Sequence, residues 1–159
     1  MIQCGKEGAV KNNIDFGAFI QIALVVKDVE KAAKEWAELF NVPVPEIKDH
    51  SNHNNPDVTY RGEVADYGMR MAVIRAGSWV VELSQPTGGK STFQEFLDKH
   101  GEGVHHLGFE VGDKRDDIVK ELEDKGYGMR QIGLYPGSSW TIVDSEGRLG
   151  VNLNIKPKR

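Results

Sequence analysis

The sequence is poor in cysteine and in long apolar runs. Its 159 residues include a single cysteine, Cys4, which cannot form a disulfide within the chain and therefore favours a reducing, cytoplasmic setting. No stretch approaches the roughly 18 consecutive apolar residues of a transmembrane helix. The first residues also lack the apolar core of a signal peptide, so we expect neither a membrane span nor a secretory leader.

An excess of basic charge is also missing. The chain carries 24 acidic and 20 basic residues, a formal net charge of -4, and it has no basic run that could bind a phosphate backbone. We therefore expect no nucleic acid partner. The length suits one compact domain.

Hydrophobic and turn patterns divide the chain into two similar halves. We expect an N-terminal arm over residues 1–17 and a single domain over residues 18–157. Within that domain a first module covers 18–86, a linker with a helix covers 87–101, and a second module covers 102–157. Each module has the pattern of a strand, a helix and three further strands.

The first module opens with an apolar strand at 18–26. Asp28 is the expected N-cap of an amphipathic helix that ends near Asn41. The next segment, 43–56, is rich in proline and asparagine and predicts an irregular loop. Three strands are expected after this loop, at 58–64, 68–76 and 78–85.

The second module opens with a strand at 104–111. Asp113 is expected to begin a helix that ends at Gly126 in a left-handed conformation. Further strands are expected near 128–134, 139–143 and 149–155, with a turn at 144–147 before the last of them.

Four polar residues occupy matching places in the two modules. Gln21 and His106 lie on the opening strands, and Glu82 and Asn154 lie on the closing strands. Alternation along a strand puts each of them on the face opposite the aliphatic row that a helix should cover. If the modules curl and meet edge to edge, the four side chains converge in one cup. The same alternation turns His105 away from His106, so we expect His105 to be structural or to lie at an interface.

Four segments carry a resemblance to a known superfamily. They are Tyr60–Gly68, Val81–Pro86, Ser91–Phe109 and Asp144–Val151. They resemble the vicinal oxygen chelate superfamily of glyoxalase, bleomycin resistance and dioxygenase proteins, and most of all its methylmalonyl-CoA epimerase-like branch. The resemblance implies an α+β fold in which two βαβββ modules form one cup-shaped mixed sheet, and it implies a homodimer.

A metal site is also implied by this resemblance. Members hold a divalent ion, such as Co, Ni, Mn, Mg or Zn, through a His or Gln, a Glu or Gln, a His and a final Glu. By position Gln21, Glu82 and His106 match these ligand types, whereas Asn154 stands where the family has Glu. A shifted register would place Asn152 there instead. Either asparagine leaves the set with one negative charge instead of two, so metal affinity should fall.

Two functions follow from the resemblance. The first is a metal-dependent isomerase or lyase of epimerase or glyoxalase type, which acts next to a carbonyl through an enolate. The alternative is a metal-free protein that binds or sequesters a small molecule on the same fold. Tyr60 and Trp140 are expected to line the cup and contact the substrate. The general base is not identified, and the alternatives for it are Glu63, Glu110, His50 and His53.

Overall fold

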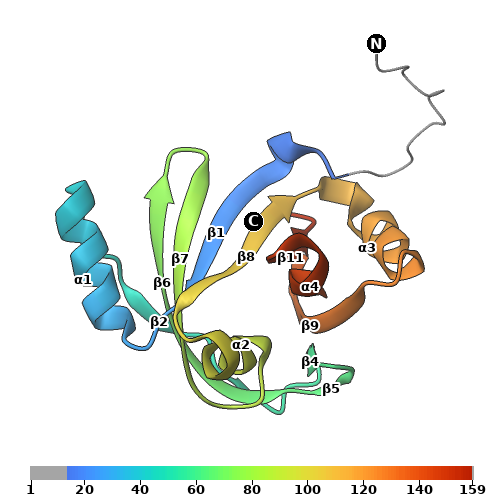
Figure 1. Cartoon of the computed structure of the whole chain (residues 1–159), viewed down its shortest axis with the longest axis horizontal. Coiled ribbons are helices and arrows are strands. Elements are labelled where there is room, and N and C mark those ends of the chain that lie inside the picture. The colour runs from blue at the N-terminus through green and yellow to red at the C-terminus, as the bar shows by residue number, and fades with distance from the viewer. Residues whose placement is uncertain (1–13, 159) are drawn as a thin grey trace.

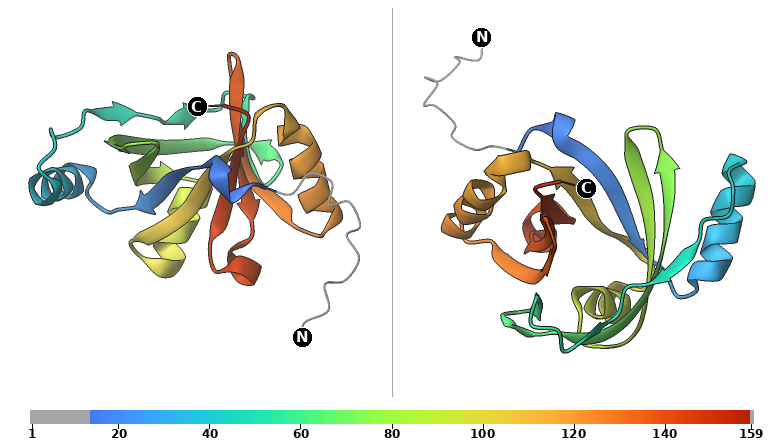
Figure 2. Two further views of the ribbon diagram at one scale, coloured as in Figure 1. Left: turned by 90° about the horizontal axis from the view of Figure 1, so that it is seen from above. Right: turned by 180° about the vertical axis from the view of Figure 1, so that it is seen from behind.

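The computed structural model describes residues 14–158, so Cys4 and most of the expected arm lie outside the described residues. Eleven strands form one mixed, strongly curled sheet, and helices pack against it (Figures 1 and 2). This architecture confirms the predicted α+β, glyoxalase-like fold. Among residues 14–158 no helix is both long and apolar enough to cross a bilayer.

The elements follow one another as two modules joined by a helix. The strands are β1 (Phe19–Val25), β2 (Ile47–Asp49), β3 (Asn52–His53), β4 (Val58–Tyr60), β5 (Glu63–Val64), β6 (Asp66–Ala76), β7 (Trp79–Gly89), β8 (Gly103–Glu110), β9 (Gly128–Tyr135), β10 (Ser138–Asp144) and β11 (Asn152–Lys156). The helices are α1 (Val29–Phe40), α2 (Thr92–His100), α3 (Arg115–Asp124) and α4 (Glu146–Leu149), with 3-10 turns η1 (Phe16–Ala18) and η2 (Gly112–Lys114).

The predicted repeat is present in the strand order. From one side of the sheet to its centre the first module runs β2-β6-β7-β1, and from the other side to the centre the second runs β9-β10-β11-β8. In each module the opening strand pairs in parallel with the closing strand, β1 with β7 and β8 with β11. The two opening strands, β1 and β8, pair antiparallel with each other. This central pairing joins the halves into one sheet.

The second strand of the first module is β2, which the sequence pattern did not predict. Residues 43–56 were expected to be irregular, but β2 and β3 both pair with β6 inside this segment. The stretch expected as one strand at 58–64 is instead a hairpin of β4 and β5. Its turn residues Arg61 and Gly62 both have left-handed φ angles, 51° and 84°. Strand β4 then pairs with β9 of the other module.

Two further boundaries differ from the prediction. Helix α3 begins at Arg115, because Asp113 lies within the 3-10 turn η2 and does not cap the helix. The last strand begins at Asn152, since residues 146–149 form the short helix α4 and Gly150 follows in a left-handed conformation. The predicted end of α3 is confirmed, because Gly126 has a φ of 87° directly after the cap residue.

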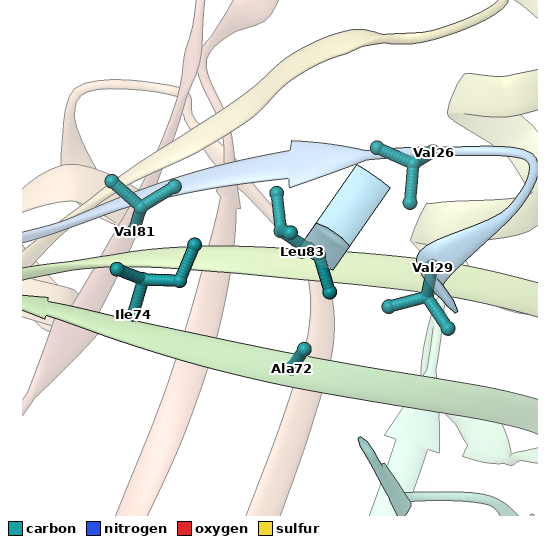
Figure 3. Packing of buried hydrophobic residues seen from close by; sticks show 7 residues of the cluster. Val26, Val29, Ala72, Ile74, Val81 and Leu83 are labelled. Carbon is teal, nitrogen blue, oxygen red and sulfur yellow. The ribbon is translucent and has the colours of Figure 1, made fainter. Parts of the chain in front are cut away.

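Helix α1 covers one face of the first module and thereby leaves the other face to the cup. Its N-cap Asp28 accepts a hydrogen bond from the Lys31 amide, as predicted. Figure 3 shows the cluster beneath it, which consists of Val26, Val29, Ala72, Ile74, Val81 and Leu83 together with Ala33. Val81 and Leu83 of β7 belong to this core. The intervening residue Glu82 therefore lies on the opposite face of the strand.

Glu146 of α4 connects the linker helix α2 with strands β9 and β11 of the second module. Its carboxylate accepts hydrogen bonds from Lys99 (3.3 Å), His100 (2.7 Å) and Arg130 (3.2 Å). The amide of Asn152 also donates to it, at 3.3 Å. Burial by itself would raise the pKa of Glu146, but the hydrogen bonds from His100 and Lys99 and the charge of Arg130 outweigh it and lower the pKa to about 2.

We expect Glu146 to stabilise the fold in a pH-dependent way. Because its folded pKa is depressed, its contribution is complete above the ordinary value of 4.5 and is lost as the pH falls towards 2. Glu146→Gln should lower the free energy of unfolding by about 2–3 kcal/mol at pH 7 and by much less near pH 2.5. Urea unfolding at both pH values measures this, with the exposed residue changed in Asp116→Asn as the control. An equal loss at both pH values would contradict the assignment.

Candidate functional site: the cup between the modules

The curled sheet encloses one cavity of about 390 Å³ that reaches the four matched polar residues. This volume is within the range of small-molecule sites. The polar residues in its lining are Gln21, Glu82, His106 and Asn154, all of them buried, together with His50, Tyr67, Tyr135 and Lys156. The apolar residues are Met69, Met71, Phe93, Trp140 and Ile142. We call this cavity the cup.

Strand pairing brings the four matched residues together symmetrically. Glu82 lies opposite Ala23, two residues beyond Gln21, and Asn154 lies opposite Gly108, two residues beyond His106. Gln21 can enter the cup because Gly108 has no side chain. A Cβ at Gly108 would lie only 2.5 Å from Gln21 Oε1. The convergence predicted from the repeat is therefore present in the structure.

The orientation of the Asn154 amide is determined by the backbone. The Thr141 N–H donates to Asn154 Oδ1 at 3.1 Å, and a backbone N–H can only donate. The other end of the amide, Nδ2, therefore faces its neighbours in the cup. It donates to Gln21 Oε1 at 3.5 Å and lies 3.4 Å from His106 Nε2. Asn154 thus presents hydrogen-bond donors to two of the residues predicted as metal ligands.

Glu82 is held by two hydrogen-bond donors, Gln21 and Ser84. Gln21 Nε2 donates to its Oε2 in a short hydrogen bond, and Ser84 Oγ donates to its Oε1 at 3.1 Å. Burial raises the pKa of Glu82, an effect that the Lys156 charge and these two hydrogen bonds only partly offset. The inward carboxylate expected from the sequence is therefore partnered by hydrogen bonds.

His105 does not turn away from His106 as strand alternation predicts. Ala23 pairs with His106, and the next residue of β1, Leu24, pairs with Val104, which is two residues from His106 on β8. His105 is therefore the extra, unpaired residue of a β-bulge. The two Nδ1 atoms lie 2.8 Å apart. His105 also stacks on Phe93, with ring centroids 4.5 Å apart. The bulge breaks the period of two, so the doublet acts as a connected pair.

Burial disfavours the charged form of both histidines. Burial lowers the pKa of His105 to about 3, although its hydrogen bond with Thr92 opposes this shift. Burial also lowers the pKa of His106 well below its ordinary value, and the neighbouring His105 and Lys156 add to the effect. Neutral imidazole carries one N–H and one lone pair, so each ring can donate at one nitrogen and accept at the other.

The four side chains do not fit a divalent metal ion as they are arranged. A metal ligand must offer a lone pair, but Asn154 offers N–H groups, and its oxygen is already bonded to the Thr141 N–H. The lone pairs of Gln21 Oε1 and His106 Nε2 face those N–H groups. Within residues 14–158 no group of three His, Cys, Asp or Glu side chains could hold a metal either.

The remaining predicted residues divide between the cup and other places. Trp140 lines the cup, and its indole lies against Gly133, where a Cβ would come within 2.1 Å of Nε1. Tyr60 does not line it; its hydroxyl donates to Glu95 on α2. Asn152 is also outside, since it bonds to the His105 carbonyl and to Glu146. The shifted register considered for β11 is therefore not the one observed.

His50 is the general-base candidate that reaches the cup, because Glu63, Glu110 and His53 are not part of its lining. Burial lowers the pKa of His50, and Asp49 partly opposes this. The sequence reading missed Lys156. Alternation from Asn154 could have found it, since the two residues are two apart on β11.

The sequence profile of the Glyoxalase/Bleomycin resistance protein/Dioxygenase superfamily matches residues 20–143. The chain belongs to this superfamily. The match extends over most of both modules, and it includes Gln21, Glu82 and His106 but ends before Asn154. A search of curated proteins finds no significant match.

Solved structures of superfamily members share the fold of this chain. A methylmalonyl-CoA epimerase of Streptomyces coelicolor, in complex with 2-nitronate-propionyl-CoA, is 21% identical with a TM-score of 0.59, over 87% of this chain and 95% of its own. A methylmalonyl-CoA epimerase with bound methylmalonyl-CoA and NH4+ is 21% identical with a TM-score of 0.59, and the match covers 87% of this chain and 92% of that one. The methylmalonyl-CoA epimerase of Mycobacterium tuberculosis is 15% identical with a TM-score of 0.61, and the match covers 89% of this chain and 88% of that one. The structural likeness shows that the fold is shared, but at such low identities it does not specify the reaction.

Proposed function

We propose that the cup binds a small anionic carbonyl compound without a resident metal ion. The observation that carries this proposal is the Asn154 amide, whose Nδ2 donates towards both Gln21 Oε1 and His106 Nε2. An N–H donor satisfies the same lone pairs that a cation would use, so the polar side of the cup is complete without a metal. This supports the metal-free member of the two functions that the sequence suggests.

Charge and shape in the lining support the class of ligand. Lys156 brings a positive charge to the lining of the cavity, where an ion pair is weakened less by solvent than at the surface. Phe93 and Trp140 add flat apolar surfaces on the same cavity. A short carboxylated carbonyl compound combines the charge and the apolar part that these residues would contact.

A matched ligand panel tests this proposal. Small carbonyl compounds with a carboxylate should raise the melting temperature more than neutral compounds of the same size, and EDTA should not change the difference. Lys156→Gln should weaken binding of the carboxylated compounds about tenfold, because it removes one charge-assisted contact. Lys158→Gln, two residues further along the chain, is the control. A requirement for added metal, or a preference for the neutral compounds, would overturn the proposal.

A metal-dependent isomerase or lyase of epimerase or glyoxalase type is the second candidate. It is favoured by the convergence of Gln21, Glu82 and His106, which are accepted ligand types, and by the epimerase fold of the solved neighbours. The donor orientation of Asn154 stands against it. Deuterium uptake beside the thioester carbonyl of methylmalonyl-CoA separates the two candidates, since only the second expects uptake that requires added Co²⁺ and stops with EDTA.

We also propose that the chain forms a homodimer in the cytoplasm. The dimer is supported by the resemblance to the superfamily, and the cytoplasmic location by the single cysteine, Cys4. Light scattering at two protein concentrations measures the mass in solution against 17.7 kDa for one chain.

A further inference from the structure

We propose that His105 and the Thr92 carbonyl are positioning groups that hold His106 in the Nδ1–H tautomer, with its Nε2 lone pair directed into the cup. The inference deepens the proposed function, since it specifies what the cup presents to a ligand. Two independent lines of hydrogen-bond direction lead to this tautomer, one from each end of the same chain of polar groups.

The first line starts at the backbone of β10. The Thr141 N–H makes the nearby atom of Asn154 an oxygen, so the atom 3.4 Å from His106 Nε2 is the amide nitrogen. An amide nitrogen donates and has no lone pair to offer. His106 Nε2 must therefore accept, and the proton of this neutral ring is on Nδ1.

The second line starts at the backbone of α2. His105 Nε2 lies 3.3 Å from the Thr92 carbonyl oxygen and 3.1 Å from the Thr92 hydroxyl. A carbonyl only accepts, so the proton of His105 is on Nε2 and its Nδ1 carries a lone pair. His106 Nδ1 lies 2.8 Å from His105 Nδ1 and must donate to its lone pair. Both lines thus assign the same proton to His106.

Packing holds the hydrogen-bonded chain of Thr92, His105 and His106, here called the relay, in place. His105 and His106 are both essentially unexposed, and His105 lies between Phe93, which stacks on it, and Phe96, which meets it edge-on at 5.3 Å. Thr92 is anchored in turn, because its N–H donates to Gln131 Oε1 of β9 at 2.8 Å. The bulge in β8 is what brings the two imidazoles close enough to bond.

The tautomer limits what can bind beside His106. A ligand group that displaces the Asn154 N–H from His106 Nε2 has to supply a donor in its place, such as a hydroxyl or an N–H. A bare carboxylate oxygen would face a lone pair there, so the anionic end of a ligand is expected at Lys156 instead.

Nitrogen-15 NMR of the ligand-free protein at neutral pH tests the inference. The five histidines are assigned by single substitutions. His106 should show a protonated Nδ1 and an unprotonated Nε2, and His105 the reverse. A protonated Nε2 on His106 would overturn the proposal. This measurement needs no ligand or metal, so its result is distinguished from that of the ligand panel that tests the proposed function.

Variants of the relay sharpen the test. His105→Phe keeps the stacking on Phe93 but removes the acceptor and leaves only the Asn154 N–H to favour the tautomer, so the His106 signals should shift part of the way towards those of the other tautomer. His105→Asn offers an oxygen near the Nδ1 position and should restore the original shifts. Thr92→Val removes the hydroxyl but keeps the carbonyl, so it should leave His106 unchanged. Unaltered His106 shifts in His105→Phe would contradict the positioning role; if that variant does not fold, the wild-type spectrum decides.

Discussion

Asn154→Glu is expected to turn a cup that takes up no divalent metal into one that binds Co²⁺ or Ni²⁺ stoichiometrically. The substitution replaces N–H donors with a carboxylate next to Gln21 Oε1 and His106 Nε2. It also adds a second negative charge to that of Glu82, which favours a divalent cation. Metal analysis of wild type and variant, both purified without chelator, measures the change.

Stability provides a second measurement on the same variant. Without metal, two carboxylates in one buried cup should repel each other and lower the melting temperature. Saturating metal should restore stability by about 2.7 kcal/mol when its concentration is a hundred times the dissociation constant. Asn154→Gln is the control, because it has the same length without the charge and should bind no metal. Stoichiometric metal in the wild type would overturn the metal-free proposal.

Glu82→Gln is expected to stabilise the protein by about 2–4 kcal/mol at pH 7. Glu82 is buried in the cup, and an ionised carboxylate there carries a desolvation cost that a neutral amide avoids. The amide can keep both hydrogen bonds, since its oxygen can accept from Gln21 and its nitrogen can donate to the Ser84 hydroxyl. Such a gain would mean that Glu82, a residue of the cup, lowers the stability of the wild-type protein.

The pH dependence identifies the cause of this gain. Because the folded pKa of Glu82 is raised, the wild type loses stability as the pH rises above the ordinary value of 4.5, until the pH exceeds the folded pKa. The difference between variant and wild type should therefore grow from pH 4 to pH 7. Glu63→Gln, an exposed residue outside the cup, should change stability by less than about 0.5 kcal/mol. A constant difference across this range would exclude burial of charge as the reason.

The repeat and the residues that converge could be predicted because they depend on local regularities. Alternation along β1 and β7 puts Gln21 and Glu82 on one face, and the matching places of His106 and Asn154 follow from the second copy. The N-cap at Asp28 and the left-handed Gly126 are also local features. Each of these needs only neighbouring residues to specify it.

Features that depend on distant partners could not be predicted in the same way. Strand β2 has Ile47 as its one apolar residue and exists because it pairs with β6. Strand β4 pairs with β9, more than seventy residues away, so its place was not visible in its own pattern. His105 lies in a bulge whose position is set by the facing strand β1, and the period of two fails there.

The sequence alone predicted that four polar side chains of two similar modules face one cup, and that the last of them is an amide where the resemblance to the superfamily implies a carboxylate. Only the tertiary structure decided which end of that amide faces inward. The deciding group is the Thr141 N–H on the neighbouring strand, which must bond to an oxygen and so turns the Asn154 nitrogen towards Gln21 and His106. The sequence specifies the type of each side chain, but the direction in which an amide forms its hydrogen bonds depends on the partners that the fold places next to it.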